Sequence, residues 1–260
     1  MTVFELNELL NRRFPPELSC DWDNDGLLVS ADRGATVSGV LIALDLTDAA
    51  IDEAVATGCN VILTHHPLIF HPLHRVTCED GVPRRVIRLI SLGISSIACH
   101  TRADAAPGGL NDAMAEMLSL SGVMAFTDGI ARIGKLPAPL PASKAVSLIL
   151  GASGAEKALF SGNAPKMIEY VAICCGDGKD CLFDVEEQGA DLFLTGELSY
   201  HARLDAADLP FLVMEIGHDR SEMHALSVFR DALASEAPDL PVVLFPYYAG
   251  DGFSGGRLDI

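Results

Sequence analysis

The sequence is poor in positive charge. It has 18 lysine and arginine residues against 36 aspartate and glutamate residues, which gives a formal net charge of −18. The densest basic stretch is RRVIR (residues 84–88), which carries only three positive charges. Proteins bind nucleic acid largely through lysine and arginine contacts with its phosphates. A chain of this charge without a basic stripe is therefore not expected to bind nucleic acid.

Long apolar runs are also missing. No stretch approaches the roughly 20 consecutive apolar residues that span a bilayer, although hydrophobic residues make up 49% of the chain. The first residues, MTVFELNELLNRRF, are amphipathic and charged, unlike the basic and then apolar pattern of a signal peptide. We therefore expect a globular, cytoplasmic protein that is not anchored in a membrane.

The seven cysteines include no C-x-x-C motif, and their number is odd. Several lie within apolar runs, as buried thiols do. This pattern favours reduced core cysteines over disulfides, with a cysteine metal site as the alternative. A Walker-type phosphate loop is also missing, because CCGDGKD (residues 174–180) is followed by no lysine at the required spacing.

What the chain does have is a repeated order of short apolar strands and helices. Residues 39–45 (GVLIALD) are typical of a buried strand, and the helix expected after them has Thr47 as its N-cap and ends at Gly58. Further strands are expected at residues 60–66, 94–100, 144–151, 170–178, 190–197, 209–218 and 241–252, and further helices at residues 83–93, 109–122 and 219–237. This alternation predicts an α/β fold with a largely parallel sheet.

One stretch interrupts the pattern. Residues 135–143 (KLPAPLPAS) carry three prolines, which indicates a linker or an edge connection. We therefore expect an N-terminal α/β lobe at residues 1–134 and a C-terminal α/β lobe at residues 135–260, either as separate lobes or as one intertwined unit.

Polar residues of the kinds that bind metals gather where the predicted strands end. They are Asp45, His65 and His66, His100 and Asp104, Glu197, and His218 and Glu222. In open α/β sheets, ligands bind beyond the carboxyl ends of the strands. Adjacent histidines in a regular strand point to opposite faces, but at a strand end both can turn toward the same edge. The alternative is a hydrogen-bonded histidine pair in a loop; the other strand ends favour a site.

The donor types indicate more than one metal ion. His218 and Glu222 are four positions apart at the start of a helix, so they lie on one face. With His65, His66 and Asp104 they exceed what a tetrahedral catalytic zinc ion needs. The set suits two ions about 3.5–4 Å apart, bridged by a carboxylate and a water. Its nitrogen and oxygen donors favour zinc, iron, manganese, cobalt or nickel.

Five motifs occur in a fixed order between Trp22 and Glu222: DWDNDGLLV, THHPLIF, HTRADAAPGGLND, LTGELSYH and GHDRSE. Together they resemble the Nif-three-like dinuclear metal-centre family, whose members are often labelled GTP cyclohydrolase 1 type 2 homologues. The resemblance implies two α/β lobes with a dinuclear metal site in the cleft between them, and a toroidal homohexamer built as a trimer of dimers. It carries the family's metal ligands onto His65, His66, Asp104, His218 and Glu222, with Asp104 or Glu222 as the bridge.

Three residues depart from the family pattern. Asp25 stands where the family commonly has an apolar residue, and His71 and His74 stand where a basic or variable residue is expected. None of them is an expected ligand, so the departures concern the substrate and leave the metal set intact.

Other polar residues have two readings. Glu197 and His201 form an i,i+4 pair in GELSYH that could shuttle protons or orient a metal-bound water. The alternative is a glutamate favoured by a helix dipole and a surface histidine. Asp45 could hold a ligand imidazole, but the pattern slightly favours a structural role near the N-cap. Trp22 could stack on a substrate base, although a single tryptophan is more often part of a core.

Two functions fit these residues. In a metal-dependent hydrolase, the two ions would acidify a bound water for attack on an electrophilic carbon or phosphorus. The family label suggests GTP ring opening. The alternative is a non-catalytic metal-binding, metal-handling or regulatory hexameric scaffold, which needs the same ligands and no proton shuttle.

Overall fold

The computed structural model of the chain describes residues 1–246. Within that range it divides into two compact units: unit 1 comprises residues 1–106 and 225–246, and unit 2 comprises residues 107–224. The boundary expected between residues 134 and 135 falls inside unit 2 in this division. The end of the expected last strand, residues 247–252, lies outside the described residues. No helix in the described range has the length and hydropathy needed to cross a membrane.

Unit 1 is built on a five-stranded sheet with the order β1-β4-β3-β2-β11. Neighbouring strands from β4 to β11 are parallel, and β1 is antiparallel to β4. The strands are β1 (Gly26–Val29), β2 (Val40–Ala43), β3 (Val61–Thr64), β4 (Ser95–Ala98) and β11 (Val242–Phe245). The helices are α1 (Val3–Arg13), η1 (Pro16–Leu18), α2 (Asp48–Thr57), α3 (Gly81–Leu92), α4 (Thr101–Ala105) and α10 (Ala225–Glu236).

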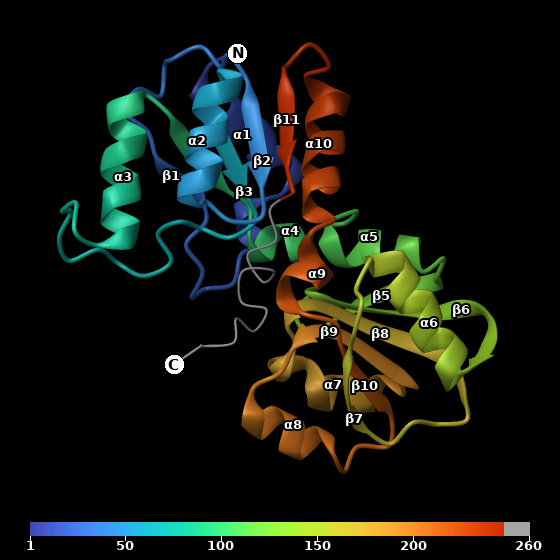
Figure 1. Cartoon of the computed structure of the whole chain (residues 1–260). Coiled ribbons are helices and arrows are strands. Elements are labelled where there is room, and N and C mark those ends of the chain that lie inside the picture. The colour runs from blue at the N-terminus through green and yellow to red at the C-terminus, as the bar shows by residue number, and fades with distance from the viewer. Residues whose placement is uncertain (247–260) are drawn as a thin grey trace. The chain divides into compact units, whose positions relative to one another are not determined.

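The helices of unit 1 form where the sequence predicts caps and apolar faces. The Thr47 hydroxyl accepts a hydrogen bond from the N–H of Ala50 (3.1 Å), and α2 ends at Gly58 with φ 72°. Both caps are confirmed. Helices α2 and α3 share one core cluster with alternate residues of β2 and β3, so they cover one face of the sheet (Figure 1). Helices α1 and α10 meet through Phe14 and Phe229, whose ring centroids lie 5.5 Å apart.

Unit 2 is built on a six-stranded sheet with the order β5-β6-β8-β9-β10-β7 (Figure 1). Only β8, β9 and β10 are parallel to one another, and the other three pairings are antiparallel. This sheet is therefore mixed, and the expectation of mostly parallel strands holds for unit 1 alone. The strands are β5 (Ser121–Phe126), β6 (Ala131–Pro141), β7 (Leu159–Gly162), β8 (Met167–Asp177), β9 (Leu192–Glu197) and β10 (Leu212–Glu215). The helices are α5 (Leu110–Met117), α6 (Ala142–Ser153), η2 (Lys179–Cys181), α7 (Leu182–Gln188), α8 (Tyr200–Ala206) and α9 (His218–Glu222).

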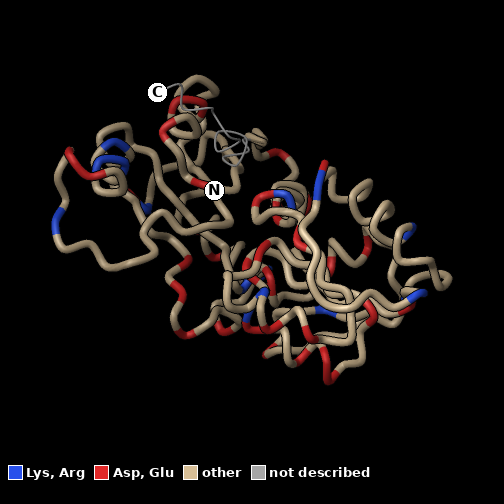
Figure 2. Tube along the Cα trace, turned by 60° about the horizontal axis from the view of Figure 1, so that its bottom comes forward, with Lys and Arg blue, Asp and Glu red and all other residues tan. Residues whose placement is uncertain are grey.

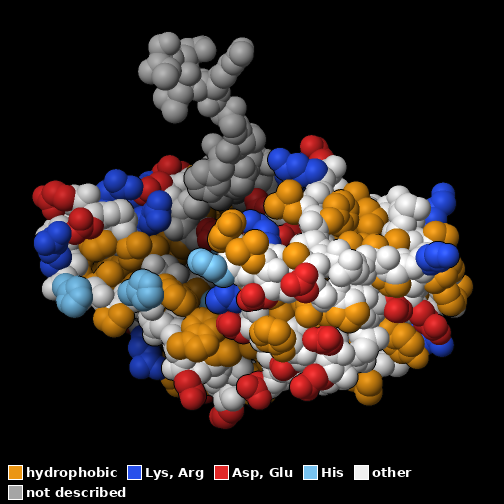
Figure 3. All heavy atoms as spheres, turned by 90° about the horizontal axis from the view of Figure 1, so that it is seen from below, with side chains coloured by type: hydrophobic (Ala, Val, Ile, Leu, Met, Phe, Trp, Pro, Cys, Tyr) orange, Lys and Arg blue, Asp and Glu red, His pale blue; other side chains and the backbone are white. Residues whose placement is uncertain are grey.

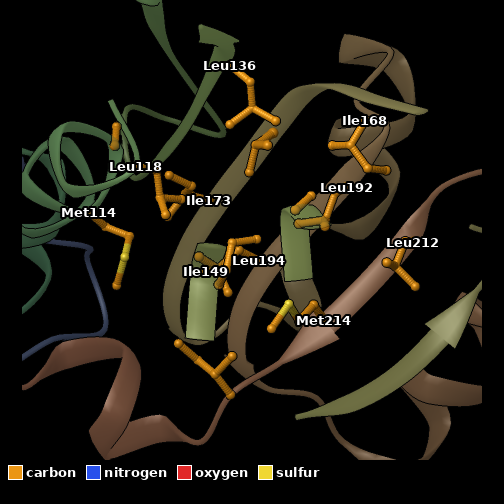
Figure 4. Close-up of a cluster of buried hydrophobic side chains, with 14 of the residues drawn as sticks. Met114, Leu118, Leu136, Ile149, Ile168, Ile173, Leu192, Leu194, Leu212 and Met214 are labelled. Carbon is orange, nitrogen blue, oxygen red and sulfur yellow. The ribbon is translucent and has the colours of Figure 1, made fainter. Parts of the chain in front are cut away.

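Two expectations for unit 2 were wrong. Residues 135–143 are not a linker, because they form the end of β6 and the start of α6. Residues 144–151 are not a strand, because they lie in α6, which buries Ala145 and Ile149 one helical turn apart. Ile149 packs in a cluster of apolar side chains from β8, β9 and β10 (Figure 4). The helix expected at residues 219–237 is also two helices, since α9 ends at Glu222 and α10 begins at Ala225.

Figure 2 shows acidic residues spread along the chain of each unit, with basic residues gathered in fewer places. One of these places is α3, where Arg84, Arg85 and Arg88 all contact the carboxylate of Asp48. Arg88 also pairs with Asp52. The densest basic stretch of the sequence is thus largely neutralised by neighbouring carboxylates.

Candidate metal centre

Three of the predicted strand ends lie at one edge of the unit 1 sheet. Ala43, Thr64 and Ala98 are paired in register at the last positions of β2, β3 and β4. Asp45, the histidine pair and His100 follow these strands. The other two strand ends belong to the sheet of unit 2, where Glu197 ends β9 and His218 follows β10. The expectation that all five ends share one edge was wrong, because the chain forms two sheets.

Three histidines gather at the unit 1 edge. One ring nitrogen from each of His65, His66 and His100 lies within 4.8 Å of the others. Their ring centroids are 4.9 to 5.5 Å apart. His65 is buried, and the other two are half-buried. Such a cluster of imidazoles is the donor type that transition metals favour.

Each of the two adjacent histidines is held through its Nδ1 atom. His65 Nδ1 lies 3.0 Å from the carbonyl oxygen of Cys99, and His66 Nδ1 lies 2.9 Å from Oδ1 of Asp45. A carbonyl only accepts a hydrogen bond, as an ionised carboxylate does, so Nδ1 carries the hydrogen and Nε2 presents a lone pair. Histidines that bind metals are commonly oriented in this way. Asp45 therefore orients an imidazole, where the sequence slightly favoured a purely structural role.

His100 is held by Asp23 in the same manner. Its Nδ1 atom lies 2.8 Å from Oδ1 of Asp23, and the N–H and hydroxyl of Thr101 donate to Oδ2 (3.1 and 2.6 Å). Burial raises the pKa of Asp23, but these hydrogen bonds and the charge of His100 outweigh it and lower the pKa to about 2. The carboxylate is thus ionised at neutral pH. Sequence analysis gave Asp23 no role; the closely spaced carboxylates of DWDND were the available signal.

Asp104, a predicted ligand, is buried in α4 beside His65. Its Oδ2 atom lies 3.8 Å from Nε2 of His65. That separation is too long for a hydrogen bond, but two ligands can have it when each lies about 2.0–2.2 Å from a shared ion. Unit 1 thus brings together three predicted ligands, and His100 lies against two of them.

Unit 2 brings together the other two predicted ligands. His218 and Glu222 lie one turn apart in α9, with His218 Nε2 at 3.2 Å from Oε2 of Glu222. His218 Nδ1 lies 3.1 Å from Oε1 of Glu197, so this imidazole too is held through Nδ1. Glu222 is buried, while Glu197 is exposed. Glu197, predicted as a proton shuttle, therefore contacts a predicted ligand directly.

His201 is not drawn into this arrangement. It lies exposed on α8, where its ring contacts that of Tyr200 at 5.4 Å between centroids. It makes no hydrogen bond within residues 1–246. The i,i+4 spacing from Glu197 does not bring the two side chains into one relay, because β9 ends at Glu197 and α8 begins only at Tyr200.

Glycine makes room for the unit 2 pair. At Gly176, which has φ 73°, a Cβ atom would lie 2.3 Å from Oε1 of Glu222 and 3.5 Å from Cε1 of His218. The N–H of Gly176 also donates to the hydroxyl of Ser221 (2.9 Å). At Gly196 a Cβ atom would lie 2.9 Å from Cα of His218. The end of β8 and the end of β9 therefore form a backbone cradle in which only glycine leaves the two donors in place.

We expect Gly176→Ala to weaken metal binding through this steric contact. Gly189→Ala is the matched control, because Gly189 has φ 71° and a Cβ atom there has no neighbour within 4 Å. Both variants should lose about 1–2 kcal/mol of stability from the left-handed backbone. Only Gly176→Ala should displace Glu222 and lower metal affinity, as measured by competition with a chelating dye. Equal affinities for the two variants would contradict the cradle.

Asp25, whose role the sequence left open, pairs with a buried arginine. Its Oδ2 atom lies 3.0 Å from Nε of Arg102, and it also accepts from the N–H of His100 (3.2 Å). Arg102 donates in turn to the carbonyl of Ala98 (2.9 Å) at the end of β4. Burial raises the pKa of Asp25, and the Arg102 charge opposes that rise. This ion pair fixes the segment that carries His100 and Asp104.

The Duf34/NIF3 sequence pattern, described as NGG1p interacting factor 3, matches residues 1–248. The chain belongs to the Duf34/NIF3 family. The resemblance stated from the motifs is thus confirmed. This Duf34/NIF3 chain is 33% identical to a GTP cyclohydrolase 1 type 2 homolog of Clostridium perfringens over 85% of its length and 88% of the relative. It is 30% identical to a protein NIF3 homolog of Schizosaccharomyces pombe, with 84% of each chain covered.

The fold of this Duf34/NIF3 protein is shared with a solved structure. A hypothetical protein of Staphylococcus aureus, SA1388, superposes with a TM-score of 0.86 at 24% identity. The match covers 94% of this chain and 96% of the other. At that identity the likeness supports the fold.

Proposed function

We propose that this Duf34/NIF3 protein binds two divalent transition-metal ions per chain at one dinuclear centre. Unit 1 would supply His65, His66 and Asp104, and unit 2 would supply His218 and Glu222. The observation that carries the proposal is common to the three histidines: a carbonyl or carboxylate oxygen fixes Nδ1 and leaves Nε2 for an ion. The nitrogen and oxygen donors suit zinc, iron, manganese, cobalt or nickel.

The donor numbers support one shared centre over two separate sites. His218 and Glu222 offer two donors, fewer than the three protein ligands that a catalytic transition-metal site usually has. The unit 1 set has donors beyond the needs of one open site, because His100 lies against His65 and His66. Two ions shared between the sets satisfy both. We propose Glu222 or Asp104 as the bridging carboxylate.

We propose that the centre catalyses hydrolysis. When bound, two such ions supply Lewis acidity and a water of lowered pKa. The protein orients the imidazoles through Asp45 and Glu197, and the exposed second oxygen of Glu197 is placed to accept a proton. His201 would relay that proton to solvent. GTP ring opening is the reaction that the name of the Clostridium perfringens relative suggests.

A non-catalytic metal-handling or regulatory scaffold is the second candidate. It is favoured by His201, which lies exposed and without a hydrogen bond in the described part of the chain, so that the expected proton relay is not assembled. A toroidal homohexamer and a cytoplasmic location are proposed for either function on the basis of family membership alone.

Metal content per chain tests the proposal. We expect elemental mass spectrometry to count close to two ions per chain after equilibration with manganese, iron, cobalt, nickel and zinc and removal of the excess. His65→Ala and His218→Ala should both lower the count, because each removes a donor from one set. A count near zero for the unmodified protein would overturn the dinuclear centre.

Variants of Glu197 separate the two functions. Glu197→Gln keeps an oxygen that accepts from Nδ1 of His218, whereas Glu197→Ala removes it. We expect Gln to retain the metal and lose hydrolysis, and Ala to lose about 10- to 100-fold in metal affinity as well. Full turnover by the Gln variant on a verified substrate would exclude the proton-transfer role. A metal-loaded protein that hydrolyses no purine nucleotide or phosphoester would favour the scaffold.

A further inference from the structure

Two large aromatic rings stand exposed beside the histidines of unit 1. Trp22 is 62% exposed and Phe70 is 40% exposed. Their ring centroids lie 5.9 Å apart with planes inclined at 63°, so they form an edge-to-face pair. The side-chain amide of Asn24 donates to the carbonyl of Ile69, which ties the loop of Trp22 to the loop of Phe70. Trp22 is therefore not part of a core, and its position is fixed by neighbouring groups.

This aromatic pair is continuous with the histidine cluster. The centroid of the His100 ring lies 6.1 Å from that of Trp22 and 6.2 Å from that of Phe70. The same His100 ring lies 5.1 Å from His65. On the face shown in Figure 3, histidines reach the surface among exposed apolar side chains. A molecule that covers the aromatic pair would thus reach the donors of unit 1 as well.

We propose that Trp22 and Phe70 form a subsite for a planar heteroaromatic ring and hold it beside the metal ligands of unit 1. The inference rests on the proposed metal centre for the purpose of that ring. Exposed tryptophan and phenylalanine faces bind flat π systems, and one stacked base contributes about 1–3 kcal/mol in nucleic-acid complexes.

Polarity selects a heterocycle over an aliphatic or hydrocarbon ligand. One side of the subsite is apolar, while the side at His100 is lined by imidazoles and by the ionised Asp23 that holds His100. A ring with polar edge atoms and flat faces matches both sides. A saturated ring has no π face to stack, and a hydrocarbon ring would leave the imidazoles without a polar partner.

Trp22 is the only tryptophan of the chain, so its fluorescence reports on this subsite alone. We would titrate the full-length, metal-loaded protein with guanosine and with nicotinamide. Ribose and the saturated analogue nipecotamide are the matched controls. We expect saturable quenching by the two heteroaromatic compounds only. Phe70→Leu keeps apolar bulk but removes the flat face, and it should weaken binding about tenfold, within the range of one stacking contact.

Phe183→Leu is the control variant, because Phe183 is an exposed phenylalanine on α7 of unit 2. It should bind both compounds as the unmodified protein does. Quenching that rises linearly without saturation, or that is equal in Phe70→Leu and the unmodified protein, would overturn the subsite. The metal content of the same samples is counted separately. Saturable binding with no bound metal would overturn the proposed function and leave the aromatic subsite standing.

Discussion

Replacing Asp25 by alanine should lower the free energy of unfolding of unit 1 by about 3–5 kcal/mol. The side chains of Asp25 and Arg102 are 7% and 1% exposed, so the substitution would leave a guanidinium buried without its counter-ion. Arg102 keeps hydrogen bonds to Asn11 and Ala98, which satisfy its donors but do not neutralise its charge. Urea denaturation followed by Trp22 fluorescence measures this change, because Trp22 lies in unit 1.

Asp21→Ala is the control for that experiment. Asp21 is exposed and makes no hydrogen bond or ion pair in the described part of the chain, so its removal should change stability by less than about 0.5 kcal/mol. The double variant Asp25→Leu, Arg102→Met replaces the pair by apolar groups and should recover part of the loss. A loss below about 1 kcal/mol in Asp25→Ala would show that the pair is dispensable.

Adding a transition metal should raise the thermal unfolding midpoint of the metal-free protein. An ion at 100 times its dissociation constant stabilises the native state by about 2.7 kcal/mol. For a chain of this size that free energy corresponds to roughly 5–10 °C. The physical reason is that the unfolded chain does not hold the donors of the two units together. Scanning calorimetry with and without a chelator measures the shift.

His65→Ala should lose most of this metal-induced shift, because His65 is buried at the centre of the unit 1 donors. His74→Ala should keep all of it. His74 is an exposed histidine in the loop before α3 and makes no hydrogen bond or ion pair among residues 1–246. The same shift in both variants would mean that metal stabilises the protein from some other place.

The donors within each unit could be predicted from the sequence because they follow apolar strands directly. In unit 1, β2, β3 and β4 end in register, so the residue types after them were sufficient to place Asp45, His65 and His100 at one edge. The partners of Nδ1 were harder to predict. Asp23 reaches His100 across 77 positions of sequence, a contact that no local spacing indicates.

The errors in unit 2 have two physical causes. Prolines usually mark a break in a sheet, but Pro137 and Pro139 lie where the pairing of β6 with β8 is interrupted, between Lys135 and Leu140. The missing N–H groups therefore cost no bond of that ladder. A short apolar run such as residues 144–151 has no periodicity that separates a buried strand from a helix. Packing of Ile149 on the sheet decides for the helix.

The division of unit 1 into two stretches of chain matters while the protein is being made. Residues 107–224 are contiguous and leave the ribosome as a finished stretch before α10 and β11 have been translated. Until then β2 has an open edge, and Phe14 lacks the phenylalanine against which it packs. The nascent chain thus carries the histidine pair of unit 1 from early in synthesis. The sheet that positions these histidines is completed only near the end.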